Sequence, residues 1–386
     1  MARLQAEHLY KVFGKRPEDA VRKLEDGVGR DDLRAEGTTA AVIDASIEVA
    51  EGQIFVVMGL SGSGKSTLLR MLNGLLEPTA GTVRIDGQDL TSLSDKELRK
   101  VRSEKISMVF QHFALFPHRS VLENAAYGLE VQGLPRAERE RRATEALELT
   151  GLKGWEKSWP DELSGGMQQR VGLARALATN ADLLLMDESF SALDPLIRRD
   201  MQDQLLELQK TLKKTIVFIT HDLNEAMRLG DRIAVMRDGR IVQTGTAEDI
   251  LVRPANDYVA SFTQDVDRSR VLTAGAIMDE IGTVLGMTTA DGKKLATAAE
   301  FQAAAPATVG EDTPVAELFT PCSSSTVPVA VTCAQGKLIG AVPAARLLGV
   351  LGEAAPQDAA PDVPAPSAGG TTSLDKKTEG KVIAGA

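Results

Sequence analysis

The sequence predicts an α/β fold, and two patterns carry this prediction. Four short apolar runs show little alternation, which is typical of strands covered on both faces in a parallel sheet. These runs are IFVVM (54–58), ISMVF (106–110), LLLMD (183–187) and TIVFIT (215–220). Helical patterns lie between the runs, and the clearest follows Pro195, with apolar residues every three to four positions at Ile197, Met201, Leu205, Leu208 and Leu212. We therefore expect a largely parallel central sheet with helices between its strands.

Antiparallel additions are expected on both sides of this core in the sequence. Residues 1–14 are interpreted as a strand and loop, and 17–27 as a helix inside a charged insertion, 15–39, because proline starts it and apolar residues share one face. Alternation at Ile43, Ala45, Ile47 and Val49 predicts a half-buried antiparallel strand. Asp238-Gly239 in RIAVMRDGRIVQTG predicts a hairpin turn.

The C-terminal third has a different character. Residues 265–352 are short apolar segments separated by Gly, Pro and Thr, and STVPVAVTCAQGKLIGAV predicts two strands around a turn. We expect a small α+β region there. Residues 353–386 are rich in Ala, Pro and Gly and carry too few apolar side chains to form a core, so we expect a disordered tail.

Composition and terminal sequence disfavour several classes of protein, although a local basic patch stays open. A net charge of −10 over 386 residues does not favour general nucleic-acid binding. No run approaches the 18 apolar residues of a membrane span, and the N-terminus lacks the apolar centre of a signal peptide. Cys322 and Cys333 lie far from the conspicuous motifs, and we interpret them as reduced packing residues.

The segment GLSGSGKST has the pattern of a phosphate-binding loop. A flexible linker would explain its Gly and Ser residues, but not the buried strand before it or the amphipathic helix after it. In a phosphate loop, glycines let backbone N–H groups converge on phosphate oxygens, Lys65 reaches the β- and γ-phosphates, and Ser66 offers a hydroxyl to Mg²⁺. The candidate ATP-binding residues are Gly59, Ser61, Gly62, Ser63, Gly64, Lys65, Ser66 and Thr67.

Two acidic residues end the strand LLLMDE. Taken alone, the two acids are better explained as a solvated strand end. Beside a phosphate loop, Asp187 is expected to hold Mg²⁺ through water and Glu188 to orient the attacking water.

LSGGMQQR places Ser164, Gly165 and Gly166 before a helix. The simple interpretation is an ordinary Ser N-cap. A second helix N-terminus suited to anions suggests instead that the γ-phosphate is held from two sides.

In their order, the phosphate loop, Gln111, LSGGMQQR, LLLMDE, SALD and ITHD resemble the nucleotide-binding subunit of an ABC transporter over residues 1–250. The resemblance implies a P-loop NTPase fold in residues 1–264, with a mixed sheet core, antiparallel β additions and a helical subdomain at about 95–180. It also implies a head-to-tail dimer that sandwiches ATP. The resemblance implies that Gln111 contacts Mg²⁺ and the attacking water, and that His221 contacts the γ-phosphate. It implies that Asp194 lies in an inter-subunit loop. It also implies that the partner's ATP is contacted by Ser164, Gly165, Gly166 and Gln168.

Family members also stack adenine on an aromatic residue near the N-terminus. Phe13 in YKVFG matches that position, and Tyr10 is the second choice. A core aromatic is the alternative for Phe13.

The resemblance is strongest to ATP-binding subunits of glycine betaine/L-proline importers, which carry a similar insertion after HLYKVFG. Ser189 departs from the alanine usual there. This branch implies peripheral attachment at the cytoplasmic face of the inner membrane, separate permease subunits, an external solute-binding protein and no nucleic-acid partner. Phe113, Leu115 and Phe116 either dock the permease or pack in the core.

Members of this branch commonly end in paired CBS modules, and residues 308–351 resemble one repeat. We expect a partial or degenerate CBS-like region. Three functional alternatives stay open: an importer ATPase for another solute such as choline, carnitine or an amino acid, an ABC ATPase of repair or translation, and a nucleotide sensor. The sensor is disfavoured because Glu188 and His221 are both present.

Overall fold

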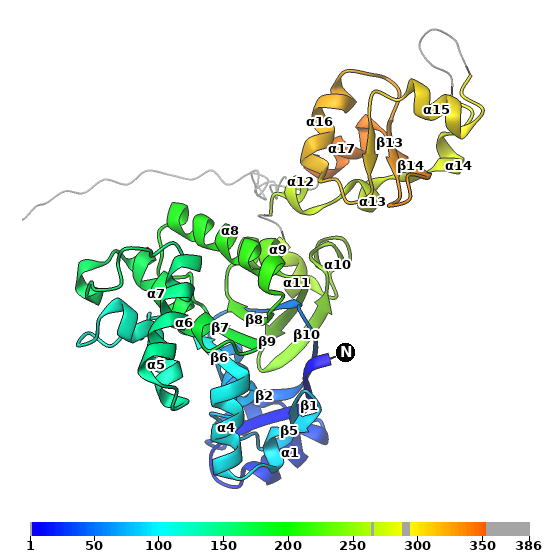
Figure 1. The fold of residues 1–386 in the computed structure, drawn as a ribbon. Helices are drawn as coiled ribbons and strands as arrows, with labels where there is room; N and C mark the ends of the chain where they lie inside the picture. The colour runs from blue at the N-terminus through cyan, green and yellow to red at the C-terminus, as the bar shows by residue number, and fades with distance from the viewer. Residues whose placement is uncertain (1, 264–265, 288–293, 353–386) are drawn as a thin grey trace, which may run out of the picture. The chain divides into compact units, whose positions relative to one another are not determined.

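The computed structural model of the chain describes residues 2–263, 266–287 and 294–352, and it contains the expected central sheet (Figure 1). Within the described residues, the strand order of this sheet is β10-β9-β3-β8-β7-β6. Its strands are β3 (Ile54–Met58), β6 (Ile106–Val109), β7 (Leu183–Asp187), β8 (Thr215–Thr220), β9 (Arg232–Arg237) and β10 (Arg240–Gly245). Strands β9, β3, β8, β7 and β6 are parallel neighbours, and β10 pairs antiparallel with β9.

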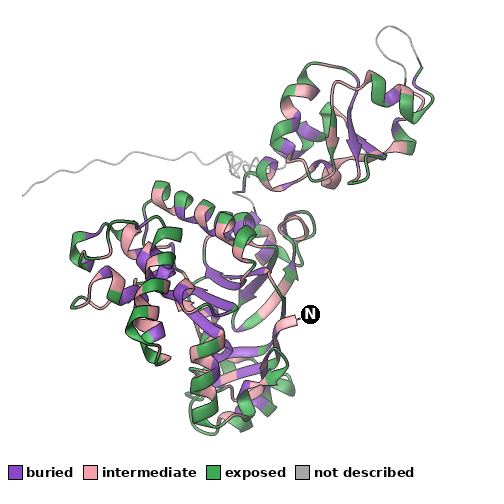
Figure 2. Cartoon of the chain, viewed as in Figure 1, coloured by how far each residue is buried: buried purple, intermediate pink, exposed green. Residues whose placement is uncertain are grey.

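The four apolar runs form four adjacent strands of this sheet, β3, β8, β7 and β6. Every residue of β3 and β8 is buried, as Figure 2 shows by the purple of these strands. Alternate β3 residues pack on opposite faces, so that Val56 lies with Met201 and Met227, whereas Val57 lies with Leu69. Covering both faces with apolar side chains explains why the runs lack alternation.

The helices that follow the strands supply these contacts. They are α3 (Lys65–Leu72), α8 (Pro195–Leu212) and α9 (Leu223–Leu229). Helix α4 (Asp95–Lys105) lies between α3 and α8 in the sequence, and α10 (Ala247–Val252) and α11 (Asp257–Thr263) follow α9. Three others pack on one another around a separate apolar cluster that includes Leu129, Leu147 and Val171. These are α5 (Val121–Val131), α6 (Arg136–Leu149) and α7 (Gly165–Ala178).

A second sheet, of order β2-β1-β4-β5, is antiparallel. Its strands are β1 (Ala2–Phe13), β2 (Thr39–Ala50), β4 (Ala80–Ile85) and β5 (Gln88–Asp89), and the insertion between β1 and β2 folds as α1 (Pro17–Glu25) and α2 (Arg30–Ala35). The predicted face of β2 is right for Ala45, Ile47 and Val49 but wrong for Ile43. Asp44 has φ 51° at a register irregularity, so Ile43 packs with the insertion helices instead.

The C-terminal part has its own sheet, of order β11-β14-β13-β12. The two strands expected around a Gly turn are β13 (Val329–Thr332) and β14 (Leu338–Val342), with Gly336 at φ 77° between them. The other elements are α12 (Arg268–Val271), α13 (Ala274–Ile277), β11 (Asp279–Glu280), α14 (Ile281–Val284), α15 (Ala298–Ala304), β12 (Thr308–Gly310), α16 (Val315–Ser323) and α17 (Ala344–Gly352). The tail expected at 353–386 lies outside the described residues.

The register of the central sheet positions the site. Met58 pairs with Thr220, Ile219 with Asp187, and Met186 with Val109. The carboxyl ends of β3, β8, β7 and β6 therefore lie side by side, and the loops that follow them meet at one edge of the sheet.

Candidate nucleotide site

The segment between β3 and α3 is a tight loop that only glycine-rich sequence can form. Gly64 has φ 106°, and a Cβ added there would lie 2.3 Å from the Ala41 carbonyl oxygen. Lys65 starts α3 and curls back over the loop, where Nζ donates to the carbonyls of Gly59 at 2.8 Å and Leu60 at 3.2 Å. The loop backbone is thus shaped around the Lys65 ammonium group.

The acidic end of β7 lies next to this loop. Ser66 Oγ donates to Asp187 Oδ1 at 3.1 Å, and Lys65 Nζ lies 3.6 Å from Glu188 Oε1. Burial raises the pKa of Asp187, an effect that the Ser66 hydrogen bond opposes. Burial lowers the pKa of Lys65, and the Glu188 carboxylate acts in the opposite direction.

Glu188 is where the loops meet. Gln111 Nε2, after β6, lies 3.5 Å from Glu188 Oε2, and His221 Nδ1, after β8, lies 3.0 Å from the same oxygen. Glu188 itself has φ 42°, a left-handed conformation rare for a side chain of this size, and its N–H donates to the Ile219 carbonyl. The structure therefore brings Gln111, Lys65 and His221 to one carboxylate.

The LSGG segment is organised within itself. Ser164 caps α7 by accepting from the Met167 N–H at 3.4 Å, and Gln168 Nε2 donates to the carbonyls of Pro160 at 2.9 Å and Leu163 at 3.3 Å. Among the described residues, no hydrogen bond or ion pair joins Ser164, Gly165, Gly166 or Gln168 to Glu188 or the phosphate loop. Just before this segment, Trp155 and Trp159 are 40% and 45% exposed.

Asp194 is exposed, and its side chain caps α8 by accepting from the Ile197 N–H at 3.1 Å. Helix capping is therefore its only role visible within one described chain. Within the described residues, the hydrogen bonds of the 164–168 segment and of Asp194 therefore stay local and do not join Glu188 or the phosphate loop.

The two N-terminal aromatic candidates for stacking on adenine differ in their exposure. Phe13 is 45% exposed, with Lys11 Nζ 5.4 Å from its ring centroid, whereas Tyr10 is 7% exposed and packs with the insertion helices. The core interpretation is thus excluded for Phe13 and holds for Tyr10.

Sequence reasoning missed a buried carboxylate beside His221. Glu225 on α9 is 4% exposed and accepts hydrogen bonds from Thr220 Oγ1 and from Gln202 Nε2. Burial raises the pKa of Glu225. The only sequence signal was the Asp222-x-x-Glu225 spacing, which here is an N-cap: Asp222 Oδ1 accepts from the Glu225 N–H.

A second missed residue is Arg175 of α7. Its guanidinium donates to the carbonyls of Ala114 at 2.6 Å and Phe113 at 3.1 Å, in the loop that follows Gln111. Phe113 and Ala114 have φ of 34° and 49°. Phe113, Leu115 and Phe116 are half-buried, and Phe113 and Leu115 pack against the edges of two apolar clusters.

A phosphate loop, an acidic strand end and a neighbouring histidine, joined at one edge of a parallel sheet, define a P-loop ATPase of the ATP-binding-cassette class. Residues 42–191 match the family model described as ABC transporter. The chain is 49% identical over 390 residues to the glycine betaine transport ATP-binding protein OpuAA of Bacillus subtilis, which covers 90% of this chain and 92% of that protein. It is 48% identical over 389 residues to the glycine betaine/carnitine transport ATP-binding protein GbuA of Listeria monocytogenes, covering 91% and 98%. This chain belongs to the ATP-binding proteins of ABC transporters, a family of ATPases coupled to transport.

Solved structures agree with this assignment. The dimeric, post-hydrolysis structure of the ATP-binding cassette MJ0796 with ADP and Pi superposes with a TM-score of 0.54 and 33% identity, covering 63% of this chain and 98% of that chain. The structural likeness therefore extends over a whole cassette.

Proposed function

We propose that this chain is the ATP-hydrolysing subunit of an ABC importer for glycine betaine and related compatible solutes, acting in osmoprotection. The observation that carries the proposal is the convergence of Lys65, Gln111 and His221 on Glu188 at the edge of the sheet. A carboxylate held beside a phosphate loop together with His221 favours hydrolysis over nucleotide sensing alone.

In the proposed reaction, each group at this edge has one task. Backbone N–H groups of the phosphate loop and Lys65 hold the β- and γ-phosphates of ATP. Glu188 orients the attacking water, and Gln111 and His221 hold the water and the γ-phosphate in line. Phe13, exposed at the end of β1, stacks on the adenine.

The donor set fits Mg²⁺. Ser66 Oγ and Asp187 Oδ1 lie 3.1 Å apart beside the phosphate loop, and hydroxyl and carboxylate oxygens are ligands that this ion prefers. Ser66, Gln111 and Asp187 would hold it, Asp187 through water. The ion would neutralise charge on the β- and γ-phosphates.

We further propose that two copies pack head to tail. Ser164, Gly165 and Gly166 at the N-terminus of α7, together with the exposed Asp194, are then the half of the site that each chain offers to its partner. The helix N-terminus after Ser164 suits the γ-phosphate of the partner's ATP. The dimeric relative with ADP and Pi supports this arrangement.

Transport also requires a path through the membrane. None of the helices in the described ranges is long and apolar enough to cross a bilayer. We propose that separate permease subunits supply the path, that the loop at Phe113–Phe116 docks against them at the cytoplasmic face, and that an external binding protein delivers the solute. The CBS-like region at 265–352 is then an accessory domain.

The solute is inferred from relatives. OpuAA is described as a glycine betaine protein and GbuA as a glycine betaine/carnitine protein, and both align along nearly their whole length. Carnitine is therefore the second candidate.

The test is uptake of labelled glycine betaine at high osmolarity, in cells that lack other importers for it. Cells carrying the chain are compared with Lys65→Ala and with Lys96→Ala, which changes an exposed lysine of α4. We expect uptake to be lost in Lys65→Ala and kept in Lys96→Ala. Equal uptake in all three, with purified Lys65→Ala unable to hydrolyse ATP, would move the assignment to another solute, with labelled carnitine tested next.

A further inference from the structure

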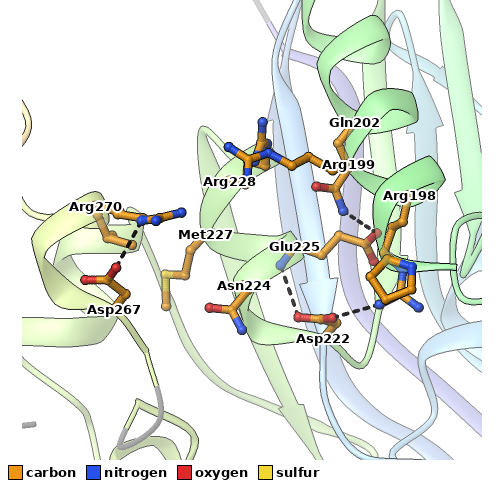
Figure 3. Close-up of a pocket in the computed structure, with 12 residues that line it drawn as sticks. Arg198, Arg199, Gln202, Asp222, Asn224, Glu225, Met227, Arg228, Asp267 and Arg270 are labelled. Carbon is orange, nitrogen blue, oxygen red and sulfur yellow. Dashed lines mark hydrogen bonds and ion pairs between the residues drawn. The ribbon is translucent and has the colours of Figure 1, made fainter.

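Helix α8 reaches the His221 turn through two polar residues one helical turn apart. Arg198 and Gln202 are at i and i+4 on α8 and therefore share a face. Figure 3 shows both side chains directed toward the segment that carries Asp222 and Glu225. Because α8 begins directly after Asp194, these two residues connect the proposed inter-subunit loop with the segment that follows β8.

Arg198 contacts both ends of this connection. Its Nη2 donates to the Leu193 carbonyl at 3.2 Å, next to Asp194, and its Nη1 lies 3.3 Å from Asp222 Oδ2, next to His221. The Arg198 and Asp222 side chains are 28% and 31% exposed, so this ion pair is partly shielded from water. One planar guanidinium thus holds two loops that are far apart in the sequence.

A buried chain of hydrogen bonds fixes the segment after β8 that carries His221. The Asp222 N–H donates to Thr220 Oγ1 at 2.9 Å, Thr220 Oγ1 donates to Glu225, and Glu225 Oε1 accepts from Gln202 Nε2 at 3.1 Å. Thr220, Glu225 and Gln202 are 2%, 4% and 7% exposed. His221 lies between Thr220 and Asp222, so its backbone is held on both sides.

We propose that Arg198 is a positioning residue that couples the inter-subunit loop at Asp194 to His221. This inference rests on the proposed function, since it gives the head-to-tail partner a route to the hydrolytic site. When the partner chain packs against Asp194, Arg198 transmits the position of the Leu193 carbonyl to Asp222. Packing of the partner against Asp194 then supports the position of His221 that the single chain shows, 3.0 Å from Glu188 Oε2.

The experiment measures kcat and the KM for ATP in the full chain, comparing wild type with Arg198→Met, Arg198→Lys and the matched control Arg199→Met. Arg199 is the next residue of α8 and is exposed. We expect kcat to fall about tenfold in Arg198→Met, the effect of one lost charge-assisted hydrogen bond, and less in Arg198→Lys. The KM for ATP should change by less than about twofold, because the Arg198 hydrogen bonds go to Leu193 and Asp222, outside the phosphate loop.

A double-mutant cycle with Asp222→Asn tests the coupling. Asn keeps the N-cap of α9 but removes the charge facing Arg198. We expect Asp222→Asn to lower kcat and to add little in an Arg198→Met background, and the same cycle with Arg198→Lys serves if the Met variant does not fold. Losses that simply multiply would overturn the proposal, as would an Arg198→Met variant as active as Arg199→Met.

Dimer formation separates positioning from simple interface support. In a Glu188→Gln background with MgATP, we expect Arg198→Met to form the same dimer by light scattering, because the defect lies in placing His221. Loss of the dimer would overturn the proposal. A wild-type chain that hydrolyses no MgATP would instead refute the proposed function, so the two failures are distinguishable.

Discussion

At the scale of single residues, the site depends on one carboxylate with an unusual backbone. Glu188 has φ 42° and its N–H is bonded to the neighbouring strand, so its side chain points to where Lys65 and His221 also reach. Left-handed conformations cost a non-glycine residue of the order of 1–3 kcal/mol. The surrounding sheet holds this strain at the position where the proposed chemistry needs it.

His8 and Asp44 also have left-handed backbone conformations, and the contact between their side chains gives a prediction about pH. His8 Nδ1 lies 2.7 Å from Asp44 Oδ1, and this hydrogen bond and charge raise the pKa of His8 above its ordinary 6.5. Because the folded-state pKa is raised, the stabilisation is full below pH 6.5 and is lost as the pH rises through the folded-state pKa. NMR titration of the imidazole signals measures the pKa of His8, and the His8→Gln variant identifies which signal belongs to His8.

The control for this titration is Asp44→Asn, which should return His8 to its ordinary pKa. A wild-type His8 that already titrates at or below 6.5 contradicts the prediction. The effect on unfolding should be small, because the His8 imidazole is exposed.

At the scale of elements, the phosphate loop is shaped by its neighbours as much as by its own sequence. Gly64 and Gly62 both have positive φ, but an added Cβ meets the Ala41 carbonyl only at Gly64 and meets nothing within 4 Å at Gly62. We therefore expect Gly64→Ala to lower the free energy of unfolding by about 3 kcal/mol or more, and Gly62→Ala by about 1 kcal/mol.

Urea unfolding of the nucleotide-free chain measures this difference, so that lost ATP binding does not enter. Equal destabilisation by the two substitutions would show that the strand carrying Ala41 yields readily. The comparison is matched, because both variants add one methyl group within the same loop.

The strands show which part of the fold the sequence could predict. Apolar runs such as IFVVM mark buried strands, and the resemblance to ABC subunits implied that Gln111, Glu188 and His221 serve one nucleotide. The parallel pairing of the strands explains why these residues meet. Register slips are different, because the bulge that turns Ile43 away depends on backbone at Asp44 that no alternation pattern records.

Polar contacts between distant segments were also beyond the sequence. Arg175 and the Phe113 carbonyl are 62 residues apart, and Arg198 and Asp222 are 24 apart. Arginine and aspartate are common surface residue types, and only packing makes Arg175, Arg198 and Asp222 join distant segments. Such pairs have no periodicity or spacing that would distinguish them from solvated charges.

At the scale of the whole molecule, the prediction concerns association. Glu188→Gln should keep ATP binding but lower the hydrolysis rate by about 10²–10⁴-fold, since the group that orients water loses its charge. The ATP-bound dimer should then accumulate, as measured by light scattering at saturating MgATP. Glu207→Gln, on an exposed face of α8, is the control and should hydrolyse ATP normally. A Glu188→Gln chain that stays monomeric argues against two complementary half-sites.

The C-terminal tail gives a second prediction at this scale. Deleting 353–386 should leave basal ATPase activity within about twofold of the full chain, because this composition supports no core. Steady-state ATPase assays check it, with circular dichroism confirming that the shortened chain is folded. A large loss of rate in a folded chain would assign the tail a role in hydrolysis.

The two tryptophans of the chain, Trp155 and Trp159, both lie just ahead of Ser164, and both are about half exposed. Excitation at the red edge of the protein absorption band therefore reads one short segment of a 386-residue molecule. The native chain carries its own optical reporter beside the surface that is proposed to receive the partner's nucleotide. Quenching by iodide, followed through an ATP cycle, would time the opening and closing of that surface without any engineered label.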